Sequence, residues 1–94
     1  MFLLISKYVK SLEEVDKVLE AHRAFLKKYY DNGTFLCSGR MNPRTGGVII
    51  CRGDNPDTVR NILKEDPFFT EKVSEYEIIE FVPTMFTEGF DKFI

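Results

Sequence analysis

The chain has 94 residues, enough for one domain with a thin core, and its apolar content of 44% is ordinary for a globular protein. A net charge of −2 argues against nucleic-acid binding and against docking on acidic membranes, since both need a basic face. No stretch approaches the ~20 apolar residues of a membrane span, and the N-terminal segment lacks a signal-peptide pattern. We therefore expect a cytoplasmic protein with a single domain over residues 1–94.

The first half of the chain predicts a strand, a long helix and two more strands. Residues 2–9 are rich in β-forming side chains, and a capping box at residues 11–14 starts a helix from Leu12 to about Asp31. Asn32 and Gly33 are typical of a left-handed helix end. Strands are then expected at residues 34–41 and 47–52, with a loop at residues 42–47 between them.

The second half predicts a helix, an extra turn and a fourth strand. Asn55 is the expected N-cap, and Pro56 occupies the first helical position, where its missing N–H does no harm. Pro67 interrupts this helix, so residues 68–73 are expected to form one further turn. The last strand covers residues 75–82. Residues 84–94 form a tail rich in aromatic side chains, which either wraps over a second subunit or frays.

The order βαββαβ indicates an α+β fold of the ferredoxin-like type, a four-stranded antiparallel sheet with two helices on one face. The strands carry apolar residues on both faces of that sheet, as with Leu4 and Ile5. Because two helices cover only one face, the open face needs a partner, and a second copy related by a two-fold axis is the simplest one. The sequence therefore predicts a homodimer.

The two cysteines, Cys37 and Cys51, are expected to be small buried hydrophobes within strands rather than redox or metal groups. One histidine, two separated cysteines and scattered carboxylates give no metal-ligand spacing, and no glycine-rich loop opens a helix. We therefore expect no metal and no cofactor.

His22, the only histidine, stands among apolar residues that recur at the spacing of one helical face. These are Leu12, Val15, Val18, Leu19, Phe25, Leu26 and Tyr29. An inward-facing imidazole needs a hydrogen-bond partner, because an unpaired buried polar group costs about 1–3 kcal/mol. By contrast, Arg23, Lys27 and Lys28 are expected on the solvent-facing side of this helix.

Asp66 is the favoured partner of His22. It lies near the inner stripe of the second helix, just before Pro67, and the two helices run side by side on the sheet. Asp31 and Asp54 are weaker candidates, since each is explained as a cap or turn residue. A carboxylate that accepts from one imidazole nitrogen makes the other more basic, which suits a general base or acid. The same pair would also serve as a purely structural hydrogen bond.

Four short patterns, in this order and spacing, resemble the YciI-like (YCII-related) family of small proteins from Met1 to about Pro83. They are His22, Ser38-Gly39-Arg40, Gly46-Gly47 and Asp66-Pro67-Phe68. The resemblance implies a dimeric α+β barrel, similar in fold to muconolactone isomerases, with a His–Asp active site at His22 and Asp66. Many members have Gly-Pro at Gly39-Arg40, so Arg40 adds a charge here.

Arg40 is a candidate for holding a substrate carboxylate through a bidentate pair, although a solvated edge charge explains it as well. Ser38, Gly39 and Tyr8 are expected to line the same cleft, with core packing as the alternative for Tyr8. The leading hypothesis is a small enzyme that moves a proton on a small organic acid, in an isomerase- or lyase-like step. The alternatives are a metabolite-binding module without catalysis and a purely structural dimer.

Overall fold

The computed structural model describes all residues, 1–94. Its elements are β1 (Phe2–Tyr8), α1 (Leu12–Lys17), α2 (Leu19–Asp31), β2 (Phe35–Arg40), β3 (Gly46–Cys51), α3 (Pro56–Leu63), α4 (Pro67–Thr70), β4 (Ser74–Glu80) and a C-terminal 3₁₀ turn (Phe90–Phe93). None of its helices is long and apolar enough to cross a lipid bilayer.

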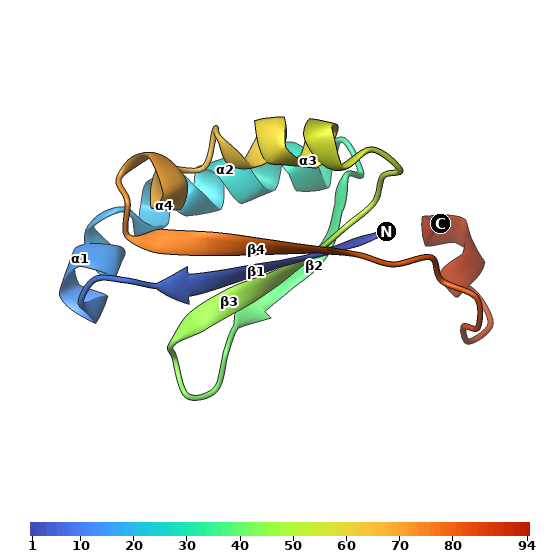
Figure 1. The fold of residues 1–94 in the computed structure, drawn as a ribbon, viewed down its shortest axis with the longest axis horizontal. Helices are drawn as coiled ribbons and strands as arrows, with labels where there is room; N and C mark the ends of the chain where they lie inside the picture. The colour runs from blue at the N-terminus through green and yellow to red at the C-terminus, as the bar shows by residue number, and fades with distance from the viewer.

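The four strands form one antiparallel sheet in the order β2-β3-β1-β4. The helices α2, α3 and α4 lie together on one face of this sheet, and the other face is uncovered (Figure 1). In the register of the sheet, Leu4 of β1 stands opposite Ile49 of β3 and Ile78 of β4. The expected ferredoxin-like α+β fold is therefore confirmed.

The buried side chains form two clusters. The larger cluster, built on Phe2, Leu4 and Phe25, fills the space between the sheet and the helices α2 and α3. The smaller cluster consists of Val15, Phe68 and Val73. Because this second cluster anchors α4 against α1, it holds the Asp66-Pro67 junction in a constant position beside α2.

The prediction of a single helix from Leu12 to Asp31 is wrong, because the helix is interrupted at Val18 and divided into α1 and α2. The Val18 N–H bonds to the Val15 carbonyl three residues back at 3.1 Å, and this tighter turn ends α1. Ser11 caps α1 by accepting from the Glu14 N–H, as the capping box predicts. Leu12 is 44% exposed and lies outside the inward-facing stripe.

Cys51 is buried as expected, and burial raises the pKa of its thiol to about 11. Cys37 is exposed, which contradicts the sequence expectation. A register irregularity between Phe35 and Cys37 places Cys37 opposite Ile50, on the sheet face that carries no helix. The thiol is therefore exposed because no helix covers this face of the sheet, and not because the strand was wrongly predicted.

The tail after Pro83 leaves the body of the domain beyond the end of β4 (Figure 1). Its aromatic rings pack on one another, with ring centroids 6.3 Å apart for Phe86 and Phe90 and 5.9 Å apart for Phe90 and Phe93. Met85 is 92% exposed. The tail thus forms its own small aromatic cluster and adds nothing to the two clusters of the core.

We predict that Gly46→Ala destabilises the fold by at least ~2 kcal/mol, because an added Cβ would lie 1.9 Å from the Ser6 carbonyl oxygen and push β3 away from β1. Gly39→Ala is the matched control, since a Cβ there meets nothing within 4 Å. Chemical denaturation of both variants measures the difference. Equal stability of the two variants would show that β1 and β3 tolerate the separation.

Candidate active site

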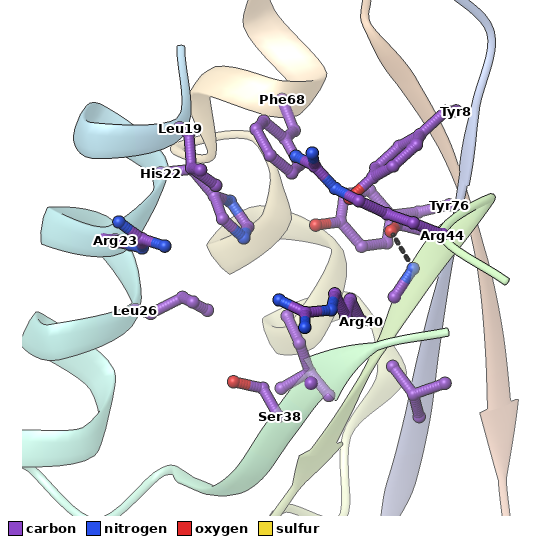
Figure 2. A pocket seen from close by; sticks show the side chains of 15 residues that line it. Tyr8, Leu19, His22, Arg23, Leu26, Ser38, Arg40, Arg44, Phe68 and Tyr76 are labelled. Atoms are coloured by element: carbon purple, nitrogen blue, oxygen red, sulfur yellow. Dashed lines mark hydrogen bonds between the residues drawn. The ribbon is translucent and has the colours of Figure 1, made fainter. Parts of the chain in front are cut away.

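One cavity of about 410 Å³ opens between α2 and the sheet (Figure 2). Side chains from β1, α2, β2, β3, α4 and β4 and from the loop between β2 and β3 line it. They include all the residues that the sequence analysis placed at a substrate cleft, namely Tyr8, His22, Ser38, Gly39 and Arg40. The geometry of His22 and its neighbours indicates what this cavity can do chemically.

His22 belongs to α2, and its side chain is 11% exposed. Its Nδ1 lies 2.7 Å from Oδ1 of Asp66, so the two residues meet as the sequence analysis expected. The imidazole also stacks flat on the Phe68 ring, with centroids 3.7 Å apart and planes within 1°. The hydrogen bond and the stack together fix the ring so that its other edge faces the cavity (Figure 2).

Asp66 is fully buried, and three donors surround its carboxylate. Oδ1 accepts from His22 Nδ1 and from the Phe68 N–H at 2.9 Å, which makes Asp66 the N-cap of α4. Oδ2 accepts from the Tyr76 hydroxyl. An ionised carboxylate only accepts hydrogen bonds, so Nδ1 of His22 is the donor in this network, and in the neutral form of the imidazole the lone pair is on Nε2.

Tyr76 belongs to the candidate site and was not predicted from the sequence. It lies on β4 opposite Ser6 of β1, where its hydroxyl reaches Asp66 from below the helices. Burial and the charge of Asp66 raise the pKa of the Tyr76 phenol well above its usual value, so it stays a donor to the carboxylate. The alternation of β4 contained a signal for it, since Tyr76 shares a face of the strand with Ile78, and both side chains pack against the larger core cluster.

Three arginines line the cavity, and no acidic residue does. Arg44 pairs with Asp16 at 2.6 Å and lies over the Tyr8 ring at 5.9 Å from its centroid. Arg23 and Arg40 belong to none of the ion pairs of the structure. Arg23 is solvent-exposed, as expected, and its side chain also lines the mouth of the cavity.

The remaining candidates are divided between this cavity and the surface. Ser38 lies beside Arg40 on β2, and its Oγ accepts a hydrogen bond from the Tyr30 hydroxyl. Asp31 pairs with Lys27 on the exposed side of α2, and Asp54 lies in the loop before α3, so neither lines the cavity. No three of the histidine, cysteine and acidic side chains are grouped so that they could hold a metal ion.

Comparison with known proteins adds an evolutionary context to this site. The profile of the YCII-related domain matches residues 1–82. The chain is a member of the YCII-related family. No curated protein matches the chain.

A similar solved structure shows the same fold. It is 5-chloro-2-hydroxyhydroquinone dehydrochlorinase from Burkholderia phenoliruptrix AC1100, in complex with 2,5-dihydroxybenzoquinone. The TM-score is 0.72 at 19% identity, over 87% of this chain and 94% of that chain. The family expected from the sequence is thus confirmed, and the fold of this YCII-related chain recurs in that dehydrochlorinase.

We predict that Tyr76→Phe flattens the loss of stability at alkaline pH. The pKa of this phenol is raised from 10.0 by folding, so the stability that it contributes is present below pH 10 and is lost as pH rises further. Above pH 10, the unfolding free energy of the wild type should fall more steeply than that of the variant, by up to ~1.4 kcal/mol per pH unit. Urea denaturation at several pH values measures both slopes.

Tyr30→Phe is the control, since Tyr30 is exposed and its hydroxyl reaches only Ser38. Its slope should follow that of the wild type. Identical slopes for the wild type and Tyr76→Phe would contradict the buried, charge-facing position of the Tyr76 phenol.

Proposed function

We propose that this YCII-related protein is a small acid–base enzyme in which His22 carries a proton to and from a small organic acid. The observation that supports this most directly is the 2.7 Å contact between His22 Nδ1 and the buried Asp66, with the opposite edge of the imidazole on a cavity. A neutral imidazole oriented by a carboxylate is a general base suited to neutral pH.

In the proposed step, Nε2 of His22 takes a proton from an acidic carbon of the substrate. The imidazolium that forms is stabilised by Asp66, whose charge is held in place by the Phe68 N–H and the Tyr76 hydroxyl. The electron pair left on the substrate forms an enolate or expels a leaving group. Return of the proton to another atom completes an isomerisation, and loss of the leaving group completes an elimination.

The neighbour of the same fold supports this reaction class. It is named a dehydrochlorinase, and loss of hydrogen chloride requires a proton acceptor. The substrate of the present chain is proposed to carry a carboxylate, because Arg40 ends β2 at the cavity and an arginine binds that group in a bidentate manner. Ser38, Gly39 and Tyr8 would shape the remainder of the substrate site.

The test is exchange of carbon-bound hydrogen for deuterium in a panel of enolisable 2-oxo acids and lactones, followed by proton NMR. His22→Gln and Asp66→Asn are expected to lower the exchange rate by ~10²–10⁴-fold, because they remove the base or its orienting partner. Arg52→Gln is the control, since Arg52 is exposed and lies outside the cavity.

Exchange at the wild-type rate in both His22→Gln and Asp66→Asn would refute the assignment of these two residues as the catalytic pair. Tight binding of a panel member without any exchange would instead favour the alternative, a metabolite-binding module.

We also propose that the protein is a homodimer through the open face of the sheet. Ile5 is flanked by the buried residues Leu4 and Ser6, so it points away from the helices, and Ile50 and Ile79 share its face. Figure 1 shows no element that covers this face. Burying these side chains against a second sheet would gain about 25 cal/mol for each Å² of apolar surface.

Light scattering coupled to size exclusion is predicted to give the wild type about twice the chain mass of 11.0 kDa. Ile5→Glu should produce monomers, because it places a charge in the centre of the interface. Leu12→Glu, at an apolar residue 44% exposed on α1, should leave the dimer intact. A monomeric wild type, or equal dissociation by both variants, would refute this interface.

A further inference from the structure

Positive charge is concentrated at the cavity far beyond what the composition provides. The whole chain has a net charge of −2, yet three of its five arginines line this one cavity together with no aspartate or glutamate. They come from three separate segments, α2, β2 and the loop between β2 and β3. An acidic protein with a cationic cavity attracts anions there while it repels them elsewhere.

Only one of the three charges is balanced by the protein. Arg44 is neutralised by Asp16 and held over Tyr8. Arg23 and Arg40 have no acidic partner, and both are solvent-exposed. They line the cavity from two sides, Arg23 from α2 and Arg40 from β2, with His22 nearby (Figure 2). Two like charges at one cavity repel, and an anion bound in that cavity relieves this repulsion.

The cavity is also large enough, and apolar enough on one wall, for an organic body between those charges. Its volume is about 410 Å³, and Leu19, Leu26 and Phe68 form part of its lining beside His22. A substrate of this shape would place its carbon skeleton against the apolar wall and its reacting carbon at Nε2 of His22. Its charged groups would face the arginines.

We propose that the ligand of this cavity is a small organic dianion whose two anionic groups pair with Arg23 and Arg40. A charge of −2 on the ligand balances the two guanidinium charges that the protein leaves unpaired, whereas a monoanion leaves one of them uncompensated. The inference rests on the proposed function for the reaction, because it names the substrate class of the same site. The binding preference itself does not require that His22 be catalytic.

The experiment compares two dianions, succinate and phthalate, with their monomethyl esters, by isothermal titration calorimetry near neutral pH. The esters have nearly the same body and one negative charge fewer. For the wild type, at least one dianion should bind ~10-fold or more tightly than its ester. Arg23→Gln and Arg40→Gln should each reduce this ratio to about threefold or less, since the second charge loses its partner.

Arg52→Gln removes the same charge at an exposed position outside the cavity and should leave the ratio unchanged. Equal affinity of dianion and ester, no measurable binding of either dianion, or an equal effect of Arg52→Gln would overturn the inference. Titration of His22→Gln separates the two proposals. If His22→Gln keeps both the dianion preference and the hydrogen exchange of the wild type, only the catalytic role of His22 is rejected. If exchange requires His22 but the protein shows no dianion preference, only the ligand class is rejected.

Discussion

The buried carboxylate of Asp66 is the constraint on which the site depends. A charge removed from water is tolerated only when donors replace its hydration. Here the donors come from three elements: His22 from α2, the Phe68 N–H from α4 and the Tyr76 hydroxyl from β4. The same three bonds therefore hold helix, turn and sheet at one point. They also decide which imidazole nitrogen carries the proton and which faces the cavity.

At this point the residues that support the structure are also those to which we assign the proposed chemistry. Asp66 caps α4, and the ring of Phe68, two residues later, forms the flat surface on which His22 stacks at 3.7 Å. The short helix is in turn anchored by the second core cluster of Val15, Phe68 and Val73. His22 thus lies in the inner wall of the cavity, where these contacts hold it in place. The unpaired charges of Arg23 and Arg40 lie at the outer rim. In the proposed reaction, a base held in place beside a cationic rim suits an anionic substrate whose reacting carbon must be positioned accurately.

Much of this arrangement could be predicted from local sequence. The features that were not predicted were missed for specific physical reasons. Helical spacing turned His22 inward, and Pro67 ended the preceding helix so that Asp66 could face α2. The break at Val18 was missed because one tight turn interrupts a stripe whose apolar spacing continues through it. Tyr76 was missed because its hydroxyl meets Asp66 only through the register of β4 against β1. Arg23 is exposed as predicted, but its place at the cavity was missed because spacing locates a Cα, whereas a long side chain reaches the cavity from beside it.

The sequence by itself determined the order of the elements, the family and the two residues of the buried pair. The order of the elements and the inward position of His22 depend on caps, prolines and side-chain periodicity, all of which act over a few neighbours along the chain. The family follows instead from the resemblance of four motifs in their order and spacing. Only the tertiary structure decided that Tyr76 completes the pair, that Cys37 is exposed and that three arginines share one cavity. Those relations join segments tens of residues apart along the chain. Packing and strand register, rather than local conformational preference, set the distances between these segments, so the sequence alone does not predict them.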